Sequence, residues 1–90
     1  MVLSRFHAPS AGADVADTAE QVLLSVPQPG GDHNGGTVLF GPDGYLYASI
    51  GDGGCCGDPD GRGQDRTELL GSILRLDVPN TGPYQVPATN

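Results

Sequence analysis

Residues 37–50 carry the stretch TVLFGPDGYLYASI, which decides the fold class. Two short runs of mostly apolar side chains, at residues 37–40 and 46–50, flank the sequence Pro42-Asp43-Gly44. A tight turn favours these three residues in this order, because proline presets one backbone angle and glycine accepts a positive φ. The stretch therefore predicts a β-hairpin in which the two runs pair antiparallel.

Four further segments have the short apolar or alternating pattern that is typical of strands. They are residues 2–6, 21–26, 72–78 and, more briefly, 84–86. Residues 8–19 and the Gly/Asp-rich residues 51–63 are predicted to be loops. Residues 65–70 carry the pattern of a single helical turn, which Gly71 would end.

The composition favours an all-β fold and indicates a piece of a larger one. The 90 residues include 15 Gly and 8 Pro, and only 6% are aromatic. No helical period persists over a window of about 11 residues, which argues against a helical bundle. So few aromatic residues would give a chain of this size a marginal core. The strands suit a sandwich, a barrel or a propeller; in a propeller, residues 1–29 would end one blade and residues 30–90 would form the next.

The charge excludes two classes of partner. Eleven Asp and Glu residues face four Arg and Lys residues, which gives a net charge of −7. A nucleic-acid binder needs a basic surface, and an anionic membrane would repel this chain. No apolar run has the length of a membrane span, and the first residues lack the pattern of a secretory signal. We therefore expect no nucleic acid and no membrane span.

A histidine and an aspartate are the candidate catalytic residues. Residues 30–36 read GGDHNGG, so glycines surround His33 and let the backbone turn sharply. Asp52 follows the second run of the predicted hairpin, and an antiparallel hairpin returns the chain to where it began. Histidine can move a proton near neutral pH, and a carboxylate holds its tautomer and raises its basicity. The sequence thus predicts a direct or water-bridged contact between His33 and Asp52. Asp32 is a competing partner, although neighbouring side chains on an extended segment usually point apart.

The Gly/Asp-rich loop at residues 51–63 gives weaker indications of phosphate or calcium binding. It contains no lysine for a phosphate-binding loop. The sequence Asp58-Pro59-Asp60-Gly61 begins like a calcium loop, but Arg62 and Leu69 occupy later ligand positions of the EF-hand template. A looser calcium site remains an alternative to a solvated acidic loop.

Three other residues with reactive side chains need an interpretation. Cys55 and Cys56 are adjacent, so they lack the spacing of a zinc-binding pair. Free thiols are favoured over a vicinal disulfide, since disulfides normally join residues whose Cα atoms lie farther apart. His7 is expected to be an ordinary surface residue.

An ordered series of motifs extends over nearly the whole chain, from Leu3 to Ala88. The series comprises DHNGG at 32–36, FGPDGYLY at 40–47, GDGG at 51–54, GDP at 57–59, QD at 64–65 and LLGSILRLDV at 69–78. It resembles the soluble glucose/sorbosone (aldose sugar) dehydrogenases. That resemblance implies a six-bladed β-propeller that uses pyrroloquinoline quinone and calcium in a periplasmic or secreted enzyme. This chain would be a fragment of about one and a half blades, and the position of Met1 inside a blade suggests a truncated or split reading frame.

The resemblance also assigns roles to individual residues. His33 would be the catalytic base beside the quinone, and Asp52 the carboxylate that supports it. The C1 hydroxyl of an aldose would lose its proton to His33 while its hydride moves to the quinone, which later reduces an electron acceptor. The product would be a lactone. Arg75 would be structural, and the other cofactor and calcium ligands would lie outside this chain.

Two alternatives to the enzyme remain open. One is a non-catalytic propeller of the same superfamily that serves as a binding module, since hedgehog-interacting proteins resemble this family without acting as sugar oxidases. The other is an unrelated calcium-stabilised β-domain.

Overall fold

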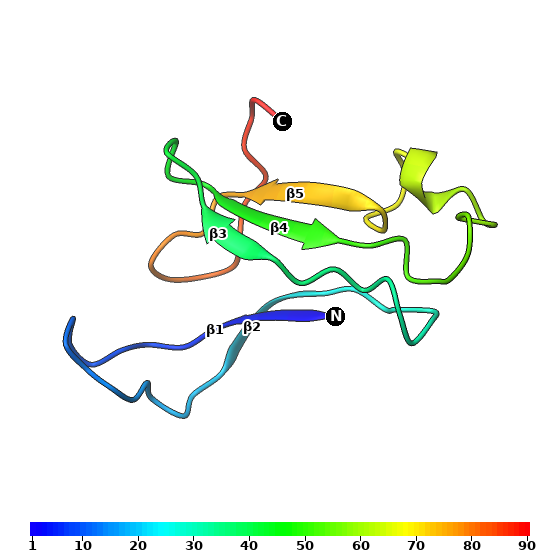
Figure 1. Ribbon diagram of the computed structural model, residues 1–90. Helices are drawn as coiled ribbons and strands as arrows, with labels where there is room; N and C mark the ends of the chain where they lie inside the picture. The colour runs from blue at the N-terminus through cyan, green and yellow to red at the C-terminus, as the bar shows by residue number, and fades with distance from the viewer.

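The computed structural model describes residues 1–90 as two antiparallel sheets with almost no helix (Figure 1). The strands are β1 (Val2–Arg5), β2 (Gln21–Ser25), β3 (Val38–Phe40), β4 (Leu46–Ile50) and β5 (Ser72–Leu76). The first sheet pairs β1 with β2, and the second has the order β3-β4-β5. The predicted all-β class is confirmed, and the arrangement is that of a partial propeller. The division into two blades at residue 30 stays a prediction.

The predicted hairpin is confirmed. Val38 lies opposite Ala48 and Phe40 opposite Leu46, so β3 and β4 pair antiparallel. The turn closes through the Gly44 N–H, which donates to the Gly41 carbonyl at 3.0 Å. Gly44 has φ +83°, a conformation that glycine adopts at little cost. The turn thus depends on the glycine that the sequence places there.

The expected helical turn at residues 65–70 is wrong. The helical turn η1 (Arg62–Gln64) lies earlier in the chain. The Asp65 carboxylate accepts hydrogen bonds from the backbone N–H and the hydroxyl of Thr67, at 2.8 and 2.7 Å. Only one backbone bond follows, from the Glu68 N–H to the Asp65 carbonyl at 3.3 Å, and the Gly71 N–H donates instead to the Gly51 carbonyl at 2.8 Å. The segment therefore makes a turn and then joins the end of β4. The three residues of η1 are far too few to cross a membrane.

The end of the chain is also less regular than the sequence predicts. The strand expected at residues 84–86 is reduced to a single antiparallel bridge between Asp77 and Gln85. The loop at residues 8–19 and the strands nearest to it agree with the prediction.

The core consists of two small apolar clusters that join the sheets. Leu3 of β1 packs with Leu46 of β4 and Leu76 of β5. The second cluster contains Val26, Ile50 and Leu70. Alternate residues of β4 are buried, so this central strand contributes to both clusters. Only 9 of 90 residues are buried, and none of them is aromatic, which agrees with the expected marginal core.

The two-cluster core predicts that Leu46→Ala destabilises the chain far more than Leu39→Ala. Leu46 is 5% exposed and links the two sheets, whereas Leu39 on β3 is 55% exposed. Truncating the buried leucine should lower the free energy of unfolding by about 2–5 kcal/mol. The exposed leucine should change it by less than about 1 kcal/mol. Urea unfolding followed by circular dichroism measures both values, and similar losses would contradict this description of the core.

Candidate functional site

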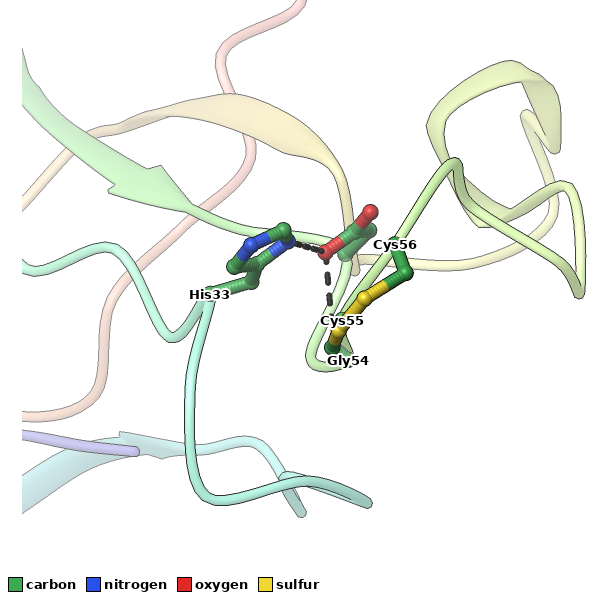
Figure 2. The surroundings of a disulfide bond; sticks show 5 residues. His33, Gly54, Cys55 and Cys56 are labelled. Atoms are coloured by element: carbon green, nitrogen blue, oxygen red, sulfur yellow. Dashed lines mark hydrogen bonds and ion pairs between the residues drawn. A yellow bond between two sulfur atoms is a disulfide. The ribbon is translucent and has the colours of Figure 1, made fainter.

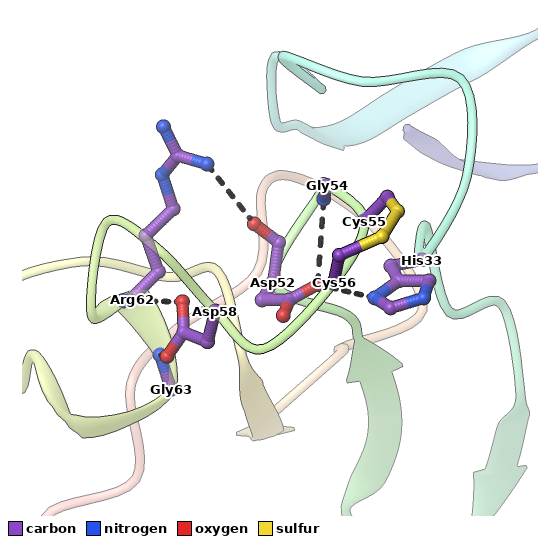
Figure 3. A network of polar contacts seen from close by, with 8 residues as sticks. All are labelled: His33, Asp52, Gly54, Cys55, Cys56, Asp58, Arg62 and Gly63. Carbon is purple, nitrogen blue, oxygen red and sulfur yellow. Dashed lines mark hydrogen bonds and ion pairs between the residues drawn. A yellow bond between two sulfur atoms is a disulfide. The ribbon is translucent and has the colours of Figure 1, made fainter.

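Two loops bring His33 and Asp52 together. His33 lies in the loop that precedes β3, and Asp52 follows the end of β4, so the antiparallel hairpin places them at the same end of the sheet. Their side chains meet with His33 Nδ1 3.0 Å from Asp52 Oδ1 (Figure 3). The predicted contact is therefore present, while the catalytic roles of the two residues stay predictions. Asp32, the competing partner, makes no hydrogen bond to the imidazole.

Backbone contacts also fix the position of His33. The His33 carbonyl accepts a hydrogen bond from the Gly53 N–H at 3.0 Å. His33 has φ +53°, a left-handed conformation that is uncommon for residues with a side chain and is often found at functional sites. Gly51 lies so close that a Cβ atom there would overlap the His33 carbonyl. The glycine after β4 thus makes room for the histidine.

Hydrogen bonds lower the pKa of Asp52. The Gly54 N–H donates to Asp52 Oδ1 at 3.3 Å, and the same oxygen faces His33. The Gly54 amide lowers the pKa of Asp52 below its usual value; burial opposes this change, and the His33 contact lowers the pKa further. The carboxylate is therefore ionised at neutral pH. It can accept the Nδ1–H of His33 and stabilise a protonated ring.

The edge of the imidazole that carries Nε2 is free. Half of the His33 side chain is exposed, against 19% of the Asp52 side chain. With Nδ1–H directed at Asp52, Nε2 carries the free lone pair, and it makes no hydrogen bond within the chain. A base held by a carboxylate, with its second nitrogen open to solvent, can accept a proton from a hydroxyl group or bind a donor on a partner.

The acidic loop uses its carboxylates internally. Asp58 accepts hydrogen bonds from the backbone N–H groups of Arg62 and Gly63, at 2.8 and 2.9 Å (Figure 3). Asp60 pairs with the Arg62 guanidinium at 2.6 Å. No group of three or more His, Cys, Asp or Glu residues is arranged to hold a metal ion. The Asp58 and Asp60 carboxylates therefore bond within the loop, and the expected calcium stays a prediction.

The expectation of free thiols is wrong. Cys55 and Cys56 form a vicinal disulfide, which lies next to Gly54 and the His33–Asp52 pair (Figure 2). The backbone accommodates the bond with Cys56 at φ +76° and Gly57 at φ +85°. The glycine that follows therefore helps the chain to make a turn that adjacent cysteines rarely reach.

A second His–Asp pair was missed by the sequence reasoning. His7 Nδ1 lies 2.8 Å from Asp17 Oδ2, and the Asp17 N–H donates to the His7 carbonyl at 2.8 Å. The pair closes the loop between β1 and β2. Both side chains are more than half exposed, and neither residue has a glycine-rich surrounding that would have singled it out. We interpret this pair as structural, which agrees with the surface position expected for His7.

The surroundings of Asp52 would suit a quinone only in part. The imidazole of His33 fits the part of a base. Pyrroloquinoline quinone carries three carboxylates, which need cations, and the cavity beside Asp52 has Arg62 as its single lining cation. That guanidinium is already paired with Asp60. The cavity measures about 210 Å³, less than the roughly 300 Å³ at which small-molecule sites begin. This cavity, which His33 does not line, therefore contains no free cation for the carboxylates of the quinone.

Comparison with known proteins identifies related sequences. The family model described as Glucose / Sorbosone dehydrogenase matches residues 2–90. HIPL1 protein of Arabidopsis thaliana is 37% identical over 91% of this chain and 14% of its own length. HIPL2 protein of the same plant is 54% identical over 62% of this chain and 8% of its own length. Hedgehog-interacting protein of Mus musculus is 40% identical over 78% of this chain and 10% of its own length. The chain therefore spans a small part of each relative.

The packing around Gly51 predicts that Gly51→Ala separates His33 from Asp52. The added methyl group would overlap the His33 carbonyl, so the loop that carries His33 must move. We expect the Asp52 pKa to rise toward its ordinary value and the His33 ring resonances to shift. Carbon-detected NMR titration of Asp52 measures the first change. Gly31→Ala is the matched control, because a Cβ atom there meets nothing within 4 Å. The same shift in both variants would contradict this role of Gly51.

The lowered pKa of Asp52 predicts a pH-dependent contribution to stability. A carboxylate whose pKa is lower in the folded state stabilises the fold above its unfolded pKa, near 3.8, and this stabilisation is lost as the pH falls through the lower folded value. Asp52→Asn should therefore lower the melting temperature at pH 6 and have little effect near pH 2. Thermal unfolding at several pH values measures the difference. Asp32→Asn is the control, and a difference for Asp52→Asn that persists at low pH would contradict the assignment.

Proposed function

Because the chain belongs to the glucose/sorbosone dehydrogenase family, we propose that it is a propeller segment that binds a protein partner and does not itself oxidise a sugar. The observation that carries this proposal is the 40% identity to Hedgehog-interacting protein of Mus musculus over 78% of the chain. The name of that relative describes an interaction with a protein. An extracellular setting, periplasmic or secreted, is part of the proposal.

Electrostatics supports a cationic partner surface. The net charge is −7, and Asp32 is exposed beside His33 without a hydrogen bond of its own. Complementary charge accelerates association and selects among partners. The exposed imidazole edge adds a hydrogen-bonding group that a partner can use. The pair at the end of the sheet would then be part of a contact surface.

A second candidate function is the oxidation of an aldose to a lactone. The specific observation in its favour is the 3.0 Å contact that leaves His33 Nε2 free. In this proposal Nε2 accepts the proton of the sugar C1 hydroxyl, while Asp52 keeps Nδ1–H in place and stabilises the imidazolium. Pyrroloquinoline quinone, when bound, would supply the hydride acceptor. In a longer protein with this activity, His33→Ala should reduce turnover by about 10²–10⁴-fold.

The binding proposal predicts that the chain binds a purified hedgehog signalling protein in biolayer interferometry. Affinity should fall several-fold as the ionic strength rises from about 0.05 to 0.5 M, because salt screens exposed charges. Asp32→Asn should weaken binding, whereas Asp14→Asn, a matched exposed change in the loop at residues 8–19, should not. Absence of binding, or equal effects of the two variants, would contradict the proposed surface.

The same proposal predicts no glucose-dependent dye reduction by the chain, even with added pyrroloquinoline quinone and calcium. The chain supplies one base and one supporting carboxylate, and positioning of the reactants accounts for up to about 7–11 kcal/mol of such a barrier. The assay is run beside His33→Ala. Turnover that depends on His33 would overturn the binding proposal in favour of the second candidate.

A further inference from the structure

The vicinal disulfide lies within reach of solution reductants. Both Cys55 and Cys56 are exposed, in a loop whose neighbouring residues are mostly glycine. Thiol–disulfide exchange requires that a thiolate approach one sulfur atom, so accessibility is the first condition for reaction. The bond meets this condition, while nothing in the proposed binding or sugar chemistry uses it.

A peptide bond and two hydrogen bonds connect the disulfide to the His33–Asp52 pair. Cys55 follows Gly54, whose N–H donates to Asp52 Oδ1 at 3.3 Å. That oxygen is the one that faces His33 Nδ1 at 3.0 Å (Figure 3). The position of the Gly54 amide therefore affects both the charge and the orientation of the carboxylate.

The backbone at the disulfide also lies outside the conformation that residues with a side chain prefer. Cys56 has φ +76°, which is unfavourable for a residue with a side chain. Once the two sulfur atoms are separate, nothing covalent keeps Cys56 in this conformation. Rotation to a negative φ would turn the peptide group between Cys55 and Cys56, and the resulting shift of the chain toward Gly54 would weaken the hydrogen bond to Asp52.

We propose that the Cys55–Cys56 disulfide is a redox-exchange site for a dithiol reductant, and that its opening releases Asp52 from Gly54 and loosens the contact with His33. One thiolate of the reductant attacks a sulfur atom of the pair and forms a mixed disulfide. Its second thiolate then displaces the cysteine. Two electrons and two protons pass to Cys55 and Cys56, which become thiols, and the reductant leaves as a disulfide. The proposal is independent of whether the pair binds a partner or moves a proton.

The probe is dithiothreitol added to the isotopically labelled chain, with the cysteine Cβ shifts reporting the oxidation state. On reduction, the Gly54 amide should exchange with solvent about fivefold faster, the factor that corresponds to the loss of a typical hydrogen bond. The Asp52 pKa should rise, because the amide that lowers it has moved. The Asp17 resonances of the second His–Asp pair should not change, since that pair lies in another loop. The double variant Cys55→Ser with Cys56→Ser should match the reduced chain and be insensitive to dithiothreitol.

Three results would overturn the proposal. The disulfide could resist a large excess of dithiothreitol. The cysteine shifts could report reduction while Gly54 and Asp52 stay unchanged. Reduction could also abolish the dispersed amide signals of β4 and β5, which would make the disulfide a support of the whole fold and not a local switch. Reduction of the wild-type chain and the double serine variant test the link between the disulfide and Asp52 independently. If the double variant does not fold, reduction of the wild-type chain still tests the proposal.

Discussion

The close approach of two glycine-containing backbones is the constraint on which the rest of the site depends. Gly51 at the end of β4 leaves space for the His33 carbonyl, and the Gly53 N–H donates to that carbonyl. A Cβ atom on Gly30 or Gly35 would likewise overlap the backbone of residues 49–53. Side chains at these positions would force the loops apart. The position of the imidazole thus depends on glycines at these points of close backbone contact.

This constraint explains why one His–Asp pair stands out from the other. His7 and Asp17 meet at a similar distance, yet both are largely exposed and close only a long loop. At His33, the backbone is held in a left-handed conformation and the carboxylate has a second donor. A group that is fixed in orientation loses less entropy when it binds or reacts. The same geometry therefore suits a binding surface and a proton acceptor, and measurements of partners and turnover distinguish them.

The sequence predicts those features that depend on local patterns and simple topology. The hairpin follows from a turn whose residues suit its backbone angles, and the His33–Asp52 contact follows from the return of an antiparallel strand. The prediction of a helical turn at residues 65–70 was wrong because long-range contacts decide this segment: Leu70 packs with Val26 and Ile50, and the Gly71 N–H donates to the Gly51 carbonyl. The state of Cys55 and Cys56 depends on a backbone conformation that neighbouring glycines permit and that composition does not reveal. The pairing of His7 with Asp17 depends on how a long loop closes, for which the sequence has no periodic signal.

Strand β3 has a consequence for the behaviour of the chain in solution. It is one of the two edges of its sheet, and its Val38, Leu39 and Phe40 side chains are 47%, 55% and 64% exposed. An open edge with apolar side chains is a template for a strand of another molecule. The strand is only three residues long, and the charge of −7 makes copies repel one another at a distance. Because salt shortens the range of that repulsion, ionic strength sets the concentration at which the chain stays monodisperse.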